Sequence, residues 1–402
     1  MSLSIFGEIA RRDAKALDVA LQNGDVSVHD VRGESGKSAM HYLVCYRKLD
    51  VEIIKLLIAH GADLYDESDL GISVIQIAMA WMVSKTTPPE TRRALETFFP
   101  WSVCFERYCF PTLHKIILGQ HQQPLATALQ DPAIRSDMNL ADDLGRTALY
   151  WAAASGNESV VRTLISAGAT VDVSSLMAAC QSNAPECTRT LLDADPTGNL
   201  AGARSMQTTP IHHAARYGDS TILSLLLSHG AHVNALDYWA STPLQSAAEH
   251  DNVAAMNYLF AHGADVNGKD WEGDTPLSEA IYGHAHNAVL WLLEHGADLG
   301  VKKSNGESIL HMVAKYGSVK MTRSLIGAKF TGLDPETKDN RGRTAQDIAS
   351  SRRYMRSNGE FQKVFEELIE SVSMAWSSGE NDQEFEEKLD DQFLDALESQ
   401  IE

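Results

Sequence analysis

Six residues near the start of the chain, Gly33-Glu-Ser-Gly36-Lys37-Ser38, have a composition that could hold a nucleotide phosphate. A phosphate-binding loop needs Gly-x-x-x-x-Gly-Lys-Ser between a strand and a helix, because its backbone N–H groups surround the phosphates. Val31 stands where the first of those glycines is required. We therefore predict a structural turn at Gly36 and a helix cap at Ser38, and no nucleotide site.

Histidine is the other residue type that could carry chemistry, since the chain has 15 of them. Four stand at the last position of a recurring four-residue motif, too far apart to share one metal ion: His41, His114, His212 and His311. The close groups are His212 with His213 and His284 with His286. Neither has the i, i+4 helix spacing and nearby third ligand that zinc prefers. The sequence predicts no metal site and no cofactor.

Nucleophilic catalysis is not indicated either. The five cysteines form no Cys-x-x-Cys pair: Cys45, Cys104, Cys109, Cys180 and Cys187. They are typical of reduced, mostly buried thiols of an intracellular protein. The chain contains no Gly-x-Ser-x-Gly motif and no cysteine in a recognisable protease setting. No catalytic residue is predicted, although an enzyme stays an open alternative.

Composition narrows the classes of partner. The formal net charge of the 402 residues is −20, which argues against direct nucleic-acid or acidic-membrane binding, because phosphates require clustered Lys and Arg. No apolar run reaches transmembrane length, and the first residues lack the basic start and apolar segment of a signal peptide. We expect an intracellular protein of the cytoplasm, the nucleus or both.

The elements that position these residues repeat along the chain, most clearly from Asp142 to Leu299. The motif heads in this region are Gly145-Arg-Thr-Ala-Leu149, Thr209-Pro-Ile-His212, Thr242-Pro-Leu-Gln245 and Thr275-Pro-Leu-Ser278. The positions Thr209, Thr242, Thr275 and Ser308 are each 33 residues apart, as are Gly230, Gly263 and Gly296. A fixed period of this size, headed by Thr-Pro-Leu-His, is typical of the ankyrin repeat. The chain resembles the ankyrin family as far as about Ser371.

One repeat shows why the letters suit a pair of helices. The Thr209 hydroxyl can cap the first turn of a short helix, and Pro210 follows where no backbone N–H is needed. Gly218 ends that helix in a turn, and a second apolar helix is expected from about Ser220 to His229. Gly230 stops it before an extended finger. A single repeat cannot bury its apolar faces alone, so the repeats must stack.

The predicted fold is therefore an all-α ankyrin solenoid of stacked helix pairs with β-turn fingers. We expect degenerate N-terminal repeats at residues 1–105, the main stack at 106–372, and an acidic amphipathic tail at 373–402. Between Pro100 and Phe110 the period is lost, and the aromatic residues there predict a buried plug between the first two parts, with an exposed recognition patch as the alternative. The broken N-terminal repeats, with Pro111-Thr-Leu-His-Lys115 and Asp143-Leu-Gly-Arg-Thr-Ala148, also resemble ankyrin proteins of filamentous fungi.

The resemblance implies that a protein partner binds finger tips and the exposed side of the first helices, on the concave face between about residues 204 and 320. Placed on that register, the partner-binding residues are Met206, Arg216, Tyr217, Tyr238, Trp239, Glu249, His250, Trp271, Tyr282, Lys315 and Tyr316. A finger has no core in which to bury Trp239 or Trp271, and Trp, Tyr and Arg are enriched at interface hot spots. The alternative is that each ring packs on the next finger and stiffens the stack.

The preferred hypothesis is a non-catalytic scaffold or adaptor for a protein partner. A second hypothesis is an enzyme or accessory protein of a specialised-metabolite pathway, with Tyr217, His250, Asp270 and Tyr282 in one groove. A third is a transcriptional or signalling regulator, whose acidic tail presents Phe385, Leu389, Phe393, Leu397 and Ile401 on one helix face. The alternative for this tail is a cap that folds back on the last repeat.

Overall fold

The computed structural model describes residues 5, 9, 14–24, 26–29, 31–32, 37–45, 50–64, 66–67, 73–84, 87–195, 208–326, 333–351 and 359–377. The chain divides into two compact units, Met1–Ala235 (unit 1) and Leu236–Glu402 (unit 2), and each is described by itself. Met206, the phosphate-loop candidate before Lys37 and the tail from residue 378 onward lie outside the described residues.

The N-terminal part of unit 1 is built of short helices around one apolar core. Its elements are α2 (Ala14–Gln22), the strand pair β1 (Val31–Arg32) and β2 (Lys37–Ser38), α3 (Ala39–Cys45), α4 (Val51–Ala59), α5 (Val74–Val83), α6 (Pro89–Phe98) and α7 (Trp101–Arg107). The two strands are antiparallel, with Val31 opposite Ser38. Helix α6 begins at Pro89, because proline is well suited to the first turn of a helix.

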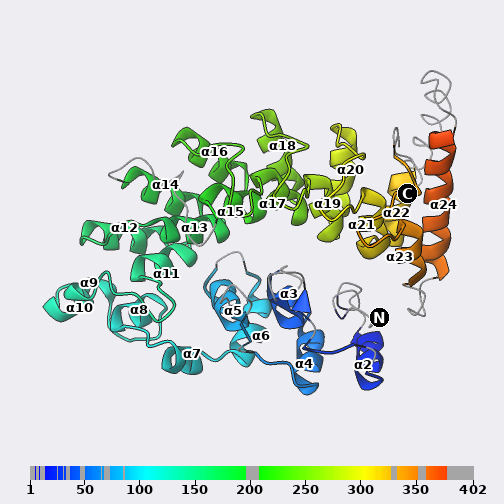
Figure 1. Cartoon of the computed structure of the whole chain (residues 1–402). Coiled ribbons are helices and arrows are strands. Elements are labelled where there is room, and N and C mark those ends of the chain that lie inside the picture. Colours follow the sequence, from blue (N-terminus) through cyan, green and yellow to red (C-terminus); the bar gives the residue numbers. More distant parts are fainter. Residues whose placement is uncertain are drawn as a thin grey trace, which may run out of the picture. The chain divides into compact units, whose positions relative to one another are not determined.

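The rest of unit 1 is a stack of helix pairs. Its helices are α8 (Thr112–Ile117), α9 (Leu125–Ala128), α10 (Pro132–Ser136), α11 (Ala148–Ala154), α12 (Glu158–Ser166), α13 (Val173–Gln181), α14 (Pro185–Asp193), α15 (Pro210–Tyr217) and α16 (Ser220–Ser228). Figure 1 shows α11, α13 and α15 as one row, and α12, α14 and α16 as a second row beside it. The first helix of each pair therefore packs on the first helix of the next pair.

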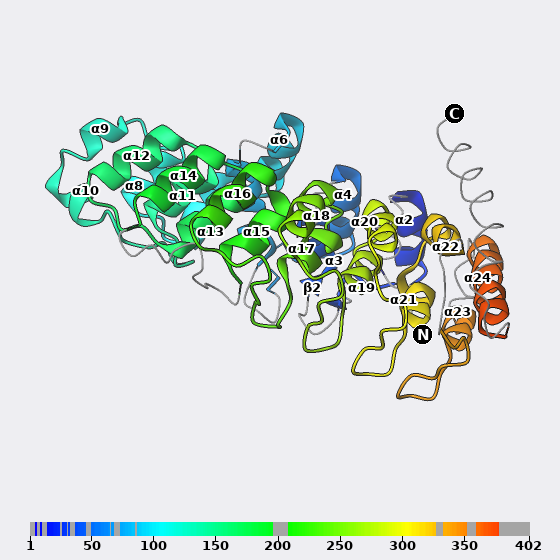
Figure 2. The same ribbon diagram turned by 90° about the horizontal axis from the view of Figure 1, so that it is seen from above.

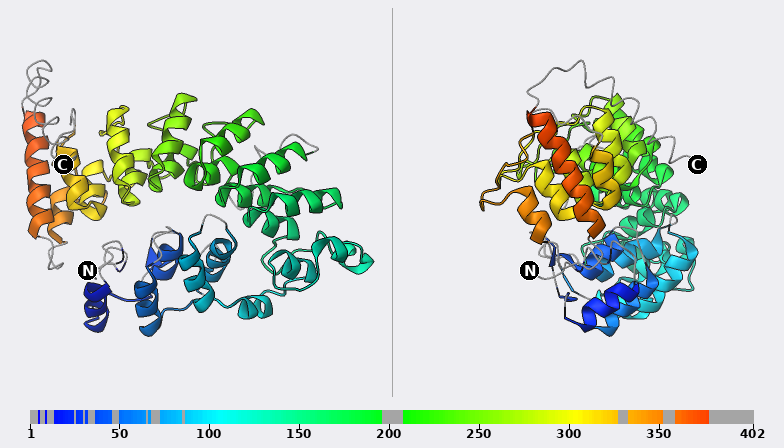
Figure 3. Two further views of the ribbon diagram at one scale, coloured as in Figure 1. Left: turned by 180° about the vertical axis from the view of Figure 1, so that it is seen from behind. Right: turned by 90° about the vertical axis from the view of Figure 1, so that its right-hand side faces the viewer.

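Unit 2 continues the same pattern. Its helices are α17 (Pro243–Glu249), α18 (Val253–Ala261), α19 (Pro276–Tyr282), α20 (His286–Glu294), α21 (Ile309–Tyr316), α22 (Val319–Ile326), α23 (Ala345–Ser351) and α24 (Gly359–Ser377). The inner helices α17, α19, α21 and α23 pack in sequence, and Figure 2 shows the fingers of this unit as long hairpin loops on one side of them. Figure 3 shows α24 beside α22 and α23 at the end of the unit.

Most threonines at the head of a repeat cap the helix that follows them. The hydroxyls of Thr147, Thr242 and Thr275 each accept a hydrogen bond from a first-turn backbone N–H. The expectation for Thr209 was wrong, because it makes no such cap. Its Oγ1 instead lies 2.8 Å from Nδ1 of His212. His212 holds the position of Gln245 and Ser278 in the next two repeats, and its imidazole is the hydrogen-bond partner of the Thr209 hydroxyl.

Neighbouring fingers are joined by side chains at the fourth motif position. Nε2 of His114 donates to the Arg146 carbonyl at 2.8 Å, and Nε2 of His311 donates to the Arg343 carbonyl at 2.9 Å. Gln245 holds the equivalent position, with Nε2 donating to the Asp274 carbonyl at 2.8 Å. The prediction that histidines at this position are structural is confirmed for His114 and His311.

Gln245 reproduces both functions of the imidazole. Its Oε1 accepts from the Thr242 N–H at 2.7 Å, as Nδ1 of His311 accepts from Ser308. We therefore expect Gln245→His to change the free energy of unfolding by less than about 1 kcal/mol. Gln245→Leu leaves the buried Thr242 N–H unpaired and removes one of two donors to the Asp274 carbonyl, so it is expected to cost about 1–3 kcal/mol. Chemical denaturation of the two variants tests this, and equal losses would contradict the equivalence.

The aromatic residues around Pro100–Phe110 form the predicted plug within unit 1. The Phe105 ring stacks on Trp101 with the ring centroids 5.5 Å apart, and its centroid lies 5.0 Å from that of Phe110. The centroids of Phe110 and Trp151 of α11 are 5.4 Å apart. Phe110 and Trp151 are buried and belong to one apolar core with the N-terminal helices. A boundary near residue 105, and one near residue 372, stay predictions.

Candidate protein-binding surface

Three aromatic side chains gather on two neighbouring fingers of unit 2. Tyr238, Trp239 and Trp271 have exposed fractions of 51%, 40% and 67%. The centroid of the Tyr238 ring lies 5.7 Å from that of Trp239 and 5.6 Å from that of Trp271, and both pairs meet edge to face. We call these three residues the finger aromatic cluster. The rings contact one another, as the stiffening alternative expected, and still present large apolar surfaces to solvent.

The turn chemistry of each finger explains why the rings are held outward. Oδ1 of Asp237 accepts from the N–H groups of Trp239 and Ser241 at 2.8 and 2.9 Å. Oδ1 of Asp270 does the same for Glu272 and Asp274. The Trp271 N–H then donates to the Trp239 carbonyl at 3.0 Å, which joins the two tips. The tryptophans therefore sit on closed turns that are bonded to each other.

Ala240 occupies a finger position that favours glycine. Its φ is +64°, and Gly273 holds the equivalent place in the next finger with φ +83°. A left-handed conformation costs a residue with a Cβ about 1–2 kcal/mol, whereas glycine loses about 0.5–1 kcal/mol in chain entropy. Ala240→Gly is thus expected to raise the free energy of unfolding by about 0.5–1 kcal/mol. Ala254→Gly, in helix α18, is the control and should lower it; a loss in both variants would contradict the interpretation.

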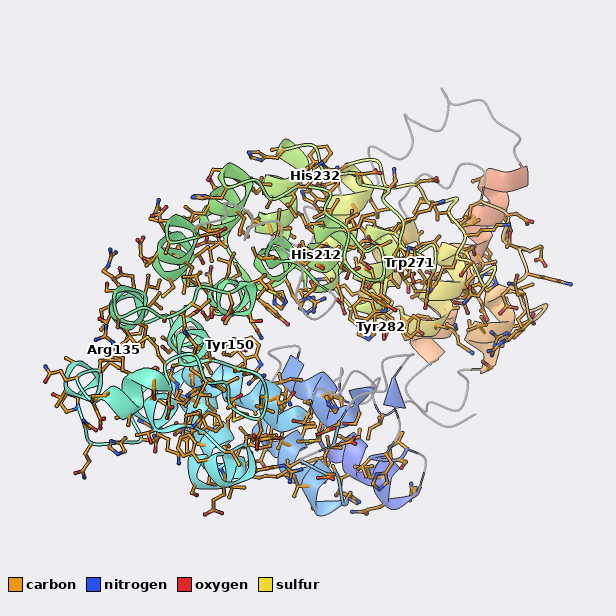
Figure 4. All side chains as sticks on the ribbon, turned by 60° about the vertical axis from the view of Figure 1, so that its left-hand side comes forward. Arg135, Tyr150, His212, His232, Trp271 and Tyr282 are labelled. Carbon is orange, nitrogen blue, oxygen red and sulfur yellow. The ribbon has the colours of Figure 1, made fainter. Side chains whose placement is uncertain are left out.

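The inner helices supply the remaining predicted residues of unit 2. Tyr282 and Tyr316 meet edge to face at 5.2 Å across α19 and α21. Lys315 pairs with Glu307, and its Nζ lies 5.9 Å from the Tyr316 ring centre. Figure 4 labels Trp271 and Tyr282 on this part of unit 2. Glu249 and His250 end α17, with Oε2 of Glu249 3.5 Å from Nδ1 of His250.

The predicted residues of unit 1 have different surroundings. The half-buried Tyr217 ring contacts Trp81 of α5 edge to face at 5.9 Å. Tyr150 of α11, labelled in Figure 4, packs with Tyr217 against the apolar core of the N-terminal helices. Arg216 has its guanidinium carbon 5.9 Å from the Tyr217 ring centre. The inner helices of unit 1 are thus in contact with an N-terminal helix of the same chain.

The geometry of stacked helix pairs and bonded fingers agrees with the comparisons to known proteins. The family profile "Ankyrin repeats (3 copies)" matches residues 173–237 and 211–303, and the profile "Ankyrin repeat" matches residues 144–175. The chain contains ankyrin repeats in residues 144–303. Among solved structures, the crystal structure of the human ASB11 ankyrin repeat domain is similar, with 25% sequence identity and a TM-score of 0.45. That match covers 56% of this chain and 98% of the other.

One group of side chains in these ankyrin repeats was not foreseen as a unit. Asp270, Asp274 and Glu279 each place a carboxylate oxygen within 4.8 Å of the other two. Lys303 of the next finger lies beside them, its Nζ 2.7 Å from Oδ2 of Asp274. Sequence reasoning named Asp270 only for the enzyme hypothesis, because the three acids are separated by a turn and a helix start. We call these three acids the carboxylate cluster.

Two acids of the carboxylate cluster, Asp270 and Glu279, have raised pKa values. Burial raises the pKa of Asp270 to about 6, against backbone hydrogen bonds that lower it. Burial raises the pKa of Glu279 well above its usual range, and the charges of Glu249, Asp274 and Asp270 raise it further, while Lys303 lowers it. A neutral Glu279 is therefore favoured by its surroundings.

These shifts predict how stability depends on pH. A carboxyl group with a raised pKa in the folded chain binds its proton more tightly when folded, so its contribution falls as pH rises. The fall begins near the unfolded value of about 4 and continues through about 6 for Asp270, and the raised pKa of Glu279 acts in the same direction. We expect Glu279→Gln to reduce this decline in the free energy of unfolding, measured by denaturation at several pH values. Glu272→Gln, an exposed neighbour, is the control; identical slopes in both variants and wild type would contradict the prediction.

The described part of the chain contains no helix that is long and apolar enough to cross a membrane. The narrower likeness to fungal ankyrin proteins stays a prediction.

Proposed function

We propose that this chain is a protein-binding ankyrin module and that its partner docks on the fingers and inner helices of unit 2. Ankyrin repeats are generally protein–protein interaction modules. The observation that carries the proposal for this chain is the finger aromatic cluster, since three large rings on adjacent finger tips remain exposed by 40–67%.

The energetic argument concerns desolvation. A monomeric protein gains nothing from leaving large apolar rings in water, and exposed groups of such rings mark interaction sites. Trp and Tyr are also the side chains most enriched among residues that dominate binding energy. Since the backbones of the Trp239 and Trp271 tips are already bonded, little ordering entropy is lost when a partner covers them.

The inner helices add polar contacts beside the rings. Tyr282 and Tyr316 are half-buried neighbours, and Lys315 places a charge near Tyr316. Such amphipathic residues can accept both apolar and hydrogen-bonding contacts from a partner. Together the fingers and inner helices offer the mixed surface that is typical of non-obligate interfaces.

The other two hypotheses have less support. The enzyme hypothesis requires one groove formed by Tyr217, His250, Asp270 and Tyr282, and the Tyr217 ring packs against Trp81 of α5. The regulator hypothesis depends on the acidic tail, whose apolar face lies outside the described residues. Both stay predictions.

The proposal is tested by quantitative pull-down from the native cell extract with wild type and with Tyr238→Ala/Trp239→Ala/Trp271→Ala. The triple variant must first show the wild-type unfolding transition, so that lost binding is not lost folding. A protein captured by wild type and absent with the triple variant supports the proposal. A protein captured equally by both places the binding surface elsewhere and overturns it.

A further inference from the structure

The carboxylate cluster is created by a tight finger turn followed at once by a helix. The Asp270 N–H donates to the Asp274 carbonyl at 3.1 Å, while Oδ1 of Asp270 accepts from the Asp274 N–H at 2.8 Å. Helix α19 starts two residues later, and its Thr275 cap accepts from Ser278, which sets Glu279 on the first turn. The three acids therefore converge through backbone geometry, which brings one oxygen from each within 4.8 Å of the others.

Asp274 is the buried centre of this arrangement. It is 6% exposed, and its Oδ2 is bonded to Lys303. Its other oxygen, Oδ1, is buried and has no hydrogen-bond partner among the described residues. An unsatisfied buried carboxylate oxygen is costly, because the charge has lost its water without replacement. This oxygen is an acceptor for a ligand that the chain itself does not provide.

The charges of the cluster show what kind of ligand would satisfy it. A bound cation would displace the proton that the surroundings of Glu279 favour; the three ionised carboxylates then carry a charge of −3 and Lys303 carries +1, which leaves −2 when the four groups are counted together. Lys303 also lies 3.6 Å from Glu272, so its charge is shared. Glu249 adds a further negative charge near Glu279. One divalent cation would neutralise the remaining charge of the cluster.

Ligand type and spacing select among divalent cations. Oxygen donors suit hard cations such as Ca²⁺, Mg²⁺ and Mn²⁺, whereas zinc prefers nitrogen and sulfur. Ca²⁺ binds oxygens at about 2.3–2.6 Å in flexible geometry, so two of its ligands stand at most about 5 Å apart. The carboxylate oxygens of the cluster lie within 4.8 Å of one another, which meets this condition. Mg²⁺ demands a stricter octahedron at shorter distances.

We propose that Asp270, Asp274 and Glu279 form a Ca²⁺-binding site in the third finger turn of the 33-residue register that begins at Thr209. The ion takes one oxygen from each residue, water completes its shell, and Lys303 stays on Oδ2 of Asp274. The ion ties the finger that carries Trp271 to helix α19. The site requires no protein partner, so it stands or falls separately from the proposed function.

Calcium titration of the full-length chain by isothermal calorimetry, at physiological salt, tests the proposal. The variants are Glu279→Gln, which removes one ligand, and Glu272→Gln, which removes the same charge from an exposed neighbour. Because the surroundings of Glu279 already favour its neutral form, the neutral glutamine of this variant is expected to leave folding intact. Tb³⁺ provides a second probe, since light absorbed by Trp271 beside Asp270 is transferred to a bound lanthanide.

We expect one saturable Ca²⁺ site in wild type, at least a tenfold weaker Kd in Glu279→Gln, and an unchanged Kd in Glu272→Gln. Tb³⁺ emission should fall in Glu279→Gln alone. Absence of saturable binding up to about 10 mM Ca²⁺ overturns the proposal, and the open oxygen would then await another cation, such as a partner's guanidinium. Binding that all variants retain equally also overturns it, because the acidic tail would then be the site.

Discussion

Replacing Trp271 with alanine is expected to weaken binding of the partner by about 2–4 kcal/mol, or roughly 30- to 1,000-fold in Kd. Trp271 is the most exposed ring of the finger aromatic cluster, at 67%, and contacts Tyr238. Its removal therefore deletes apolar surface that only a partner can bury. Folding should change little, because the side chain is mostly exposed and its backbone bond to Trp239 is retained.

Phe260 provides a matched control for the loss of an exposed aromatic ring. It is 41% exposed and lies on the outer helix α18, where it meets Trp291 and His295. Phe260→Ala should leave the Kd within about threefold of wild type. Calorimetry or surface binding with the purified partner measures both values. Equal Kd values for Trp271→Ala and wild type would contradict the assignment of the finger aromatic cluster.

Gly283→Ala is expected to destabilise unit 2 by about 3 kcal/mol or more. An added Cβ would stand 2.1 Å from the Glu249 carbonyl oxygen and 2.9 Å from its carbon. The obstacle is backbone of helix α17, which cannot rotate away as a side chain can, so α17 and α19 must separate. Overpacking of this kind usually costs about 1–3 kcal/mol and more where backbone must move.

Gly300→Ala is the control for the entropy and volume of the substitution. Its added Cβ meets the Asp298 side-chain oxygen at 3.3 Å and no backbone atom within 4 Å. Chemical denaturation should show a loss for Gly283→Ala and a change within about 0.5 kcal/mol for Gly300→Ala. If both variants unfolded like wild type, the close approach of α17 and α19 would not be required for stability.

Much of the fold could be predicted because a repeat with a fixed period presents each signal several times. The spacing of Thr209, Thr242 and Thr275 placed three helix starts, and all three helices begin at the following proline. The same register placed Trp239 and Trp271 on fingers, and their exposure there is confirmed. Local chemistry was sufficient in these cases, since capping and turn formation involve residues a few positions apart.

Contacts between distant parts of the chain were beyond the reach of the repeat pattern. The contact between Tyr217 and Trp81 joins residues that belong to different repeats. It depends on how the N-terminal helices pack on α11 and α15, which no local signal encodes. The carboxylate cluster failed to be recognised for a related reason, since its acids become neighbours only once a turn closes at Asp270 and helix α19 starts.

The most direct test of the central claim is site-specific photo-crosslinking from unit 2 in the native cell extract. A photoreactive side chain at position 272, next to Trp271 on the exposed finger, is compared with one at position 294 on the outer helix α20. If a protein partner binds the fingers, position 272 yields a defined protein adduct and position 294 does not. An adduct from position 294 alone, or from both positions equally, would contradict the account.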